Sequence, residues 1–168
     1  MLYLIGFMGV GKTTIGKQIA VLNKVVFIDT DSQIEKKTAK SINEIFETDG
    51  EFAFRKLETD TIRSIDRKAI IACGGGLPVH NNNIEYLKYN GTVIYLKASA
   101  KTLIKRLEKN KNKRPIINKL RNDKLLEFIH RILKERERTY KQADYTIETD
   151  NKTVNEVLRE INSLLLTI

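Results

Sequence analysis

Eight residues near the start of the chain have the types and the spacing of a phosphate-binding loop. The segment from Gly6 to Thr13 fits the pattern G-x-x-x-x-G-K-[ST] and directly follows the apolar run Leu2–Ile5. Glycines let backbone N–H groups close around phosphate oxygens, Lys12 supplies a mobile cation, and the Thr13 hydroxyl is a ligand for Mg²⁺. A helix that begins here would add the positive end of its dipole. The segment therefore predicts a site for a nucleoside triphosphate and Mg²⁺.

Two carboxylates follow the next strand-like run. Asp29 and Asp31 come directly after Val25–Ile28, which would place them at the carboxyl edge of a parallel sheet, where such folds bind ligands. One could organise Mg²⁺ and the other a nucleophilic hydroxyl. Taken alone, Asp31 could instead cap a helix.

Two further motifs are weaker when each stands alone. The glycine run 74–76 follows the apolar run Ala69–Cys73 and would let a small polar ligand approach backbone donors, or simply form a tight turn. Arg55 and Glu58 are three residues apart, so on a helix they share a face and can pair, although most such pairs lie on solvated surfaces. The two motifs become more informative because they occur together with the phosphate-binding loop and the two carboxylates.

The elements that must position these groups alternate between strand and helix. The expected strands are Leu2–Ile5, Val25–Ile28, Ala69–Cys73, Val93–Leu96 and Tyr145–Ile147. The expected helices are Lys12–Leu22, Glu51–Ile65, Ala100–Lys109, Lys124–Lys141 and Thr153–Leu166, with Ser99 and Thr153 as helix starts. This alternation predicts a three-layer α/β fold around a parallel sheet. The basic segment 109–115 is expected to be a mobile loop, either a lid or an ordinary solvated connection.

Length and composition narrow the class of protein. A chain of 168 residues with 41% hydrophobic residues suits one domain, 1–168. No run approaches the roughly 18 apolar residues of a membrane span, and the chain enters a strand at once, so we expect a cytoplasmic protein without a signal peptide. The net charge of +9 comes from 30 Lys and Arg residues interspersed with 21 acidic residues, and there is no Trp, so nucleic acid is not expected as a partner.

The cysteine and the histidines are not expected to do chemistry. Cys73 has apolar neighbours, which favours a buried structural thiol. His80 and His130 lack neighbouring ligand residues in the sequence and are expected to be surface or capping residues rather than metal ligands.

Taken in order, the motifs resemble those of the shikimate kinases over nearly the whole chain. The matching segments are 6–13, 29–31, 41–46, 50–51, 54–55 with Glu58, 74–76 and 114–115. The resemblance implies a P-loop kinase fold with a five-stranded parallel sheet of order 2-3-1-4-5, a small lid at about 109–121 and a substrate-binding region at about 31–60. It also implies phosphorylation of the 3-hydroxyl of shikimate by ATP with Mg²⁺, in the biosynthesis of chorismate and the aromatic amino acids, by a monomer.

The resemblance further implies roles for single residues. The residues implied to bind ATP are Gly9, Val10, Gly11, Lys12, Thr13, Thr14, Arg106, Arg114 and Lys152, with Arg106 stacked on adenine. Those implied to bind shikimate are Asp31, Phe46, Phe54, Arg55, Glu58, Gly74, Gly75, Gly76 and Arg136. Thr13 and Asp29 would hold Mg²⁺, and the catalytic residues would be Lys12, Asp31 and Arg114.

Two positions depart from the family pattern. Ala39 stands where a glycine often precedes the Ser-Ile pair, which should alter only a helix end. Counting back from Tyr140 selects Arg136 as the second carboxylate-binding arginine, but Arg138 stays open, because the stretch from Tyr140 to Asp144 is one residue shorter than the family pattern. The two arginines lie about 200° apart on one helix, so only one of them can face the site. Gluconate-type and nucleoside monophosphate kinases are the nearest rival functions. A catalytically silent nucleotide-binding module is a further alternative, although such a module would be expected to lack Asp31 or Arg55.

Overall fold

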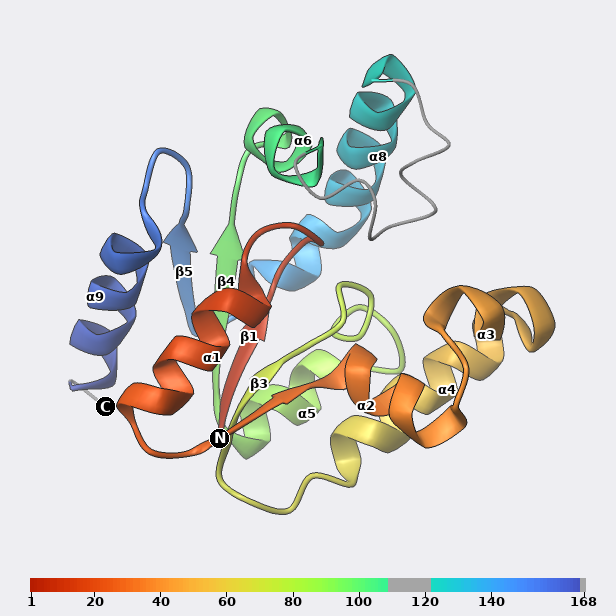
Figure 1. The fold of residues 1–168 in the computed structure, drawn as a ribbon, viewed down its shortest axis with the longest axis horizontal. Helices are drawn as coiled ribbons and strands as arrows, with labels where there is room; N and C mark the ends of the chain where they lie inside the picture. The colour runs from red at the N-terminus through yellow and green to blue at the C-terminus, as the bar shows by residue number, and fades with distance from the viewer. Residues whose placement is uncertain (109–121, 167–168) are drawn as a thin grey trace.

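The computed structural model describes residues 1–108 and 122–166, and these residues form a parallel sheet of five strands in the order β2-β3-β1-β4-β5 (Figure 1). The strands are β1 (Leu2–Ile5), β2 (Val26–Asp29), β3 (Ala69–Ala72), β4 (Thr92–Lys97) and β5 (Tyr145–Glu148). Every pair of neighbouring strands is parallel, as in β1 with β3, where Leu2 lies opposite Ile70. The predicted fold class and strand order are therefore confirmed.

Helices connect the strands in the alternating pattern that the sequence predicts. They are α1 (Lys12–Leu22), α2 (Thr30–Thr38), α3 (Ile42–Thr48), α4 (Gly50–Arg63), α5 (Asn83–Asn90), α6 (Ala100–Glu108), α8 (Asn122–Tyr140) and α9 (Val154–Leu165). Both predicted helix starts are confirmed, because the Ser99 and Thr153 hydroxyls accept hydrogen bonds from the Thr102 and Glu156 amides. The predicted lid, residues 109–121, lies outside the described residues.

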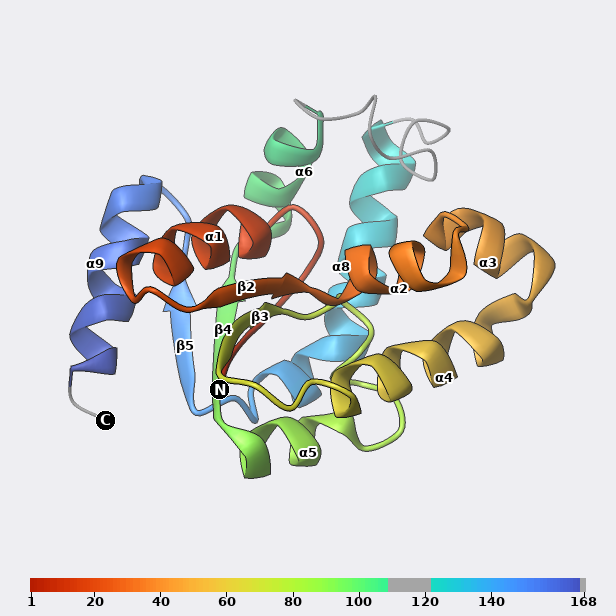
Figure 2. The same ribbon diagram turned by 60° about the horizontal axis from the view of Figure 1, so that its bottom comes forward.

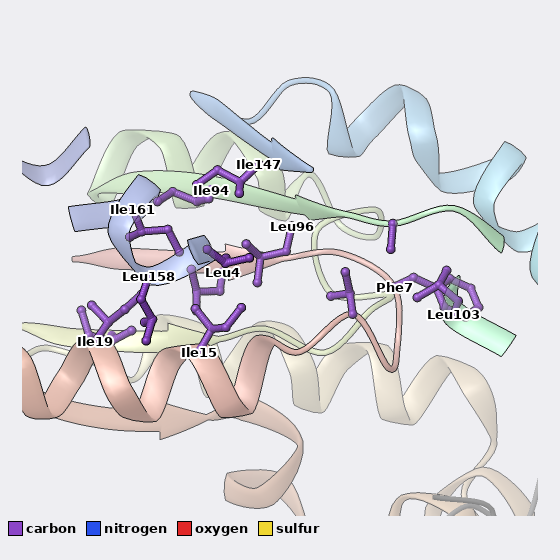
Figure 3. Packing of buried hydrophobic residues seen from close by; sticks show 14 of the residues in the cluster. Leu4, Phe7, Ile15, Ile19, Ile94, Leu96, Leu103, Ile147, Leu158 and Ile161 are labelled. Carbon is purple, nitrogen blue, oxygen red and sulfur yellow. The ribbon is translucent and has the colours of Figure 1, made fainter. Parts of the chain in front are cut away.

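Alternating side chains on the strands build two hydrophobic layers, one on each face of the sheet. On β1, Leu2 and Leu4 pack toward α1 and α9, whereas Tyr3 and Ile5 pack on the other side with residues of α4 and α5. Figure 2 shows α1 and α9 on one face and α5 on the other. Figure 3 shows the first layer, in which Ile15 and Ile19 of α1 face Leu4 and Leu158. Two covered faces explain why the central strands β1, β3 and β4 are continuous apolar runs.

Helices α2, α3 and α4 form a unit that projects beyond the sheet on the side of β2 (Figures 1 and 2). Ile34, Ile45 and Phe54 form its own small core. Ser41 begins α3 with a capping box, and Ala39 ends α2 in the left-handed region at φ 53°. The departure at Ala39 therefore does fall at a helix end. Within the described ranges, no helix is long and apolar enough to cross a membrane.

Candidate functional site

A cleft of about 1070 Å³ opens at the carboxyl edge of the sheet, around the loop between β1 and α1. It is lined by every described residue that the family resemblance assigns to ATP, namely Gly9, Val10, Gly11, Lys12, Thr13, Thr14, Arg106 and Lys152. Arg114 lies outside the described residues. The cleft is also lined by Asp29, Asp31 and Gly75. Its size and its position at the strand ends suit a nucleotide that extends toward a second ligand.

The loop has the backbone shape that phosphate binding requires. Gly9 and Gly11 adopt φ values of 83° and 110°, which are costly for residues with a Cβ atom. The ammonium group of Lys12 donates to the carbonyl oxygens of Gly6 at 2.8 Å and Phe7 at 3.1 Å. The lysine cation thus lies over the loop, and α1 begins immediately behind it.

Asp29 joins the loop to the projecting unit. Its Oδ2 accepts a hydrogen bond from the Thr13 hydroxyl at 2.8 Å, and its Oδ1 accepts one from the Ser32 amide at 3.3 Å. Asp29 is therefore the N-cap of α2, which corrects the alternative reading that gave this place to Asp31. A cap must precede the first helical turn, and Asp31 lies within that turn.

The oxygen atoms around Thr13 fit a Mg²⁺ ion. One carboxylate and one hydroxyl at the edge of a phosphate loop are what Mg²⁺ uses when phosphates and water complete its shell. Among the residues that the structure describes, no group of three or more His, Cys, Asp or Glu could hold a metal by itself. A metal here would therefore depend on the nucleotide.

The far wall of the cleft is built by Arg106 and Lys152. Arg106 donates to the Val10 carbonyl at 3.1 Å and, at the end of β5, to the Thr149 hydroxyl at 2.9 Å and carbonyl at 2.7 Å. Lys152 pairs with Glu160 at 2.6 Å. These bonds fix the Arg106 guanidinium beside the loop, and its stacking on adenine stays a prediction.

Arg55 is the centre of a second group of residues beside the cleft. Its Nη1 atom donates to Glu58 at 2.7 Å and its Nη2 atom to Glu51 at 2.9 Å. The guanidinium carbon lies 5.7 Å from the centre of the Phe46 ring and 5.2 Å from that of Phe54. Two carboxylates and two rings therefore hold the guanidinium in place. Phe54 is buried in the small core of the projecting unit and supports Arg55 from behind, and its contact with the substrate stays a prediction.

Glu58 is buried although it carries a carboxyl group, with 1% of its side chain exposed. Burial raises its pKa to about 7, although the positive charge of Arg55 opposes the shift, and the negative charge of Asp31 adds to it. Asp31 and Glu58 both pack closely against Gly74, where a Cβ atom would collide with them. The two carboxylates therefore meet across a residue without a side chain.

The glycine turn is in close contact with two arginines. A Cβ atom on Gly76 would collide with the guanidinium of Arg55, and one on Gly75 would lie 2.9 Å from Nη1 of Arg136. The Tyr140 hydroxyl donates to the Gly75 carbonyl at 2.5 Å, so the end of α8 is tied to the same turn. The glycines are thus needed for close packing as well as for a turn.

The structure places Arg136, and not Arg138, beside this turn. Arg136 is half-buried, and its positive charge opposes the rise that burial causes in the pKa of Tyr140. Arg138 is exposed. Between the two alternatives, the helix phase therefore brings Arg136 to the Arg55 side, and its contact with a carboxylate stays a prediction.

Some residues near the site had no predicted role. His80 is half-buried, and burial lowers its pKa, as do the positive charges of Arg55 and Arg136. It therefore lies near the two arginines, whereas His130 is exposed. Asn81, Asn83 and Thr59 form hydrogen bonds between the turn after Gly76 and α4. Only the asparagine run 81–83, which is typical of turns, could have drawn attention to them. Cys73 is buried, as predicted, and burial raises the pKa of its thiol.

Comparisons with known proteins agree with this geometry. The family model described as shikimate kinase matches residues 8–166. A shikimate kinase of Flavobacterium johnsoniae is 40% identical over 166 residues, which cover 96% of each chain. The crystal structure of a shikimate kinase from Bacteroides thetaiotaomicron has a TM-score of 0.91 at 33% identity and covers 98% of this chain and 97% of that one.

A third comparison concerns a protein solved with a ligand. The shikimate kinase from Acinetobacter baumannii in complex with shikimate has a TM-score of 0.89 at 37% identity and covers 99% of this chain and 92% of that one. A phosphate loop, an arginine-lined glycine turn and full-length similarity together lead to one conclusion: the chain belongs to the shikimate kinase family of ATP-using phosphotransferases.

Proposed function

We propose that this protein transfers the γ-phosphoryl group of ATP to the 3-hydroxyl of shikimate, forming shikimate 3-phosphate and ADP on the route to chorismate and the aromatic amino acids. The observation that carries the proposal is the convergence of Arg55 and Arg136 on one glycine turn, with Asp31 between that turn and the phosphate loop. Such a site suits a small molecule that has a carboxylate at one end and hydroxyls at the other.

The arginines recognise the carboxylate of shikimate in this proposal. A guanidinium donates two parallel N–H bonds to a carboxylate, which an ammonium group cannot do. Arg55 arrives with its orientation already fixed by Glu58 and Glu51, so binding costs little side-chain entropy. Amide groups of the glycine turn 74–76 would donate to the ring hydroxyls, and Phe46 supports the wall behind Arg55.

Phosphoryl transfer depends here on position and charge. Asp31 lines the cleft that also holds the phosphate loop, so its carboxylate can orient the 3-hydroxyl and take its proton. Lys12, together with Arg114 from the predicted lid, would neutralise charge on the transferring group. Thr13 and Asp29 would hold Mg²⁺, which supplies positive charge to the phosphates when it is bound with ATP.

The rival functions fit the same groups less well. A gluconate-type or nucleoside monophosphate kinase would share the loop and the sheet, but a paired-arginine site beside Asp31 suits a carboxylated polyol of shikimate's size better. A silent nucleotide-binding module has no need for Asp31 or Arg55, and both are in place.

A coupled ADP-release assay tests the function. MgATP is supplied with shikimate, gluconate, AMP or no acceptor, and wild type is compared with Asp31→Asn. We expect release only with shikimate and its loss in the variant. Release without an acceptor would mean an ATPase, and release with another acceptor would overturn the substrate.

We also propose the domain organisation and oligomeric state that the sequence predicts. The chain would act as one kinase domain with a lid at 109–121 and a substrate-binding region at 31–60, as a cytoplasmic monomer without nucleic-acid or membrane partners. The monomeric state is the expectation that the family resemblance gives. Light scattering after gel filtration would test it, and a dimer would contradict it.

A further inference from the structure

A small hydrogen-bond network joins the turn after the glycines to helix α4. The Thr59 hydroxyl donates to the carbonyl oxygen of Arg55 at 3.0 Å. The Asn81 side-chain amide donates to that same carbonyl at 3.3 Å and to the Thr59 hydroxyl at 3.0 Å. The Asn83 amide donates to the Thr59 hydroxyl at 3.1 Å and to the Leu77 carbonyl at 3.0 Å.

The network uses the full hydrogen-bonding capacity of the Thr59 hydroxyl. The O–H donor and the two acceptor lone pairs of Thr59 all have partners. The side-chain nitrogens of Asn81 and Asn83 each donate two hydrogen bonds. Thr59 is 8% exposed and Asn83 is 0% exposed, so a missing partner would leave a buried polar group unsatisfied. Asn81 adopts φ 53°, which asparagine tolerates better than most residues. This backbone conformation directs the Asn81 side-chain amide toward α4.

Other threonines on helices of this chain show what is unusual about Thr59. Thr38 and Thr48 also donate to the carbonyl four residues earlier, which is a common local bond. Thr59 alone of these three also accepts hydrogen bonds from residues 22 and 24 positions later in the chain. Its hydroxyl therefore makes tertiary hydrogen bonds that connect α4 with the segment that follows the glycine turn.

These hydrogen bonds lie where they fix the position of Arg55. The Thr59 hydroxyl and the Asn81 amide both donate to the backbone carbonyl of Arg55. The guanidinium of Arg55 packs on Gly76, at the start of the turn that carries the two asparagines. The backbone of α4 and the glycine turn are therefore held at one separation on both sides of the Arg55 side chain. A change in that separation would move the guanidinium relative to the turn and to Arg136.

We propose that Thr59 is a positioning residue, which with Asn81 and Asn83 sets Arg55 in register with the glycine turn and so determines the affinity for the carboxylated substrate. The inference rests on the proposed function, because it assumes that Arg55 binds the substrate carboxylate. Thr59 does not touch the substrate and acts through Arg55 alone.

The test compares three small substitutions. Thr59→Val keeps the shape and removes the hydroxyl, whereas Thr59→Ser keeps the hydroxyl. Thr61→Val is the matched control, because Thr61 is similarly buried on α4 at 6% exposure and its hydroxyl oxygen has no hydrogen-bond partner among the described residues. KM is measured for shikimate and for ATP, together with kcat and the melting temperature of each variant.

We expect Thr59→Val to raise KM for shikimate about tenfold, the effect of losing buried hydrogen bonds at a binding arginine, while KM for ATP changes less than about twofold. Thr59→Ser should restore KM for shikimate, and Thr61→Val should behave like wild type. An unchanged KM for shikimate in folded Thr59→Val would overturn the proposal. An equal rise in both KM values would also overturn it, because that would indicate a general structural defect.

A second variant keeps the test decisive if Thr59→Val does not fold. Asn81→Gly removes the exposed amide and adopts the same backbone conformation without strain, so it should show the same selective rise in KM for shikimate. A folded Asn81→Gly with both KM values unchanged would overturn the proposal. Failure of the proposed function looks different, since wild type itself would then release no ADP with shikimate.

Discussion

Glu58 makes the stability of this protein depend on pH in an unusual direction. Its carboxyl group is buried, and burial raises its pKa from 4.5 to about 7. Between these two values the folded protein binds one proton more than the unfolded chain. The stabilisation is therefore fully present below pH 4.5 and is lost as the pH rises through about 7.

The size of the effect follows from the same pKa. At about 1.4 kcal/mol for each pH unit, the difference between 4.5 and about 7 corresponds to about 3 kcal/mol. Glutamine has the same shape and cannot ionise, so Glu58→Gln removes the dependence. We expect the free energy of unfolding of wild type, relative to this variant, to fall by about 2 to 3 kcal/mol between pH 5 and pH 8.5.

Urea unfolding at several pH values would measure the difference, and Glu51→Gln is the control. Glu51 is the exposed carboxylate partner of Arg55, and its hydrogen bond from Arg55 lowers its pKa. It therefore titrates below the range tested, and its variant should differ from wild type by a constant amount. A constant difference for Glu58→Gln as well would refute the reasoning, because the carboxylate would then titrate at its ordinary pKa in the folded protein.

Three further substitutions test the arrangement of the site. Arg136→Ala should raise KM for shikimate about 30-fold or more through the loss of charge-assisted bonds, whereas exposed Arg138→Ala should change it less than about twofold, and the opposite ranking in steady-state kinetics would contradict the placement. Gly76→Ala should raise KM for shikimate without changing KM for ATP, since the new Cβ displaces the Arg55 guanidinium; equal KM values to wild type would show that the turn yields. Ala39→Gly should raise the free energy of unfolding by about 1 kcal/mol in urea, because φ is 53° there, and a loss of stability would contradict the strain.

Regular patterns explain why the sheet could be predicted. The central strands β1, β3 and β4 are buried on both faces, so each appears as a short apolar run, and the phosphate loop marks the first of them. Helix α2 is not among the helices that periodicity predicts, because its sequence TDSQIEKKT has a single strongly apolar residue, Ile34, and therefore no amphipathic period. Helix α3 has only 7 residues, too few to establish a period.

The details of the site required three dimensions. Arg136 and Arg138 lie on one helix, and only the rotation of α8 against the glycine turn decides which of them reaches Gly75. The bonds of Thr59 with Asn81 and Asn83 join positions more than twenty residues apart and leave no repeating pattern in the chain. Glu58 and Asp31 also meet only through tertiary packing, against Gly74.

The double role of Asp29 affects how substitutions there are to be interpreted. One oxygen serves the Thr13 hydroxyl, and the other serves the first turn of the helix that carries Asp31. Replacing Asp29 would therefore affect both sides of the proposed site, because the phosphate loop loses the partner of the Thr13 hydroxyl and α2, the helix that carries Asp31, loses its N-cap. A double-mutant cycle between positions 13 and 31 should consequently show coupling between Thr13 and Asp31, with Asp29 as the link.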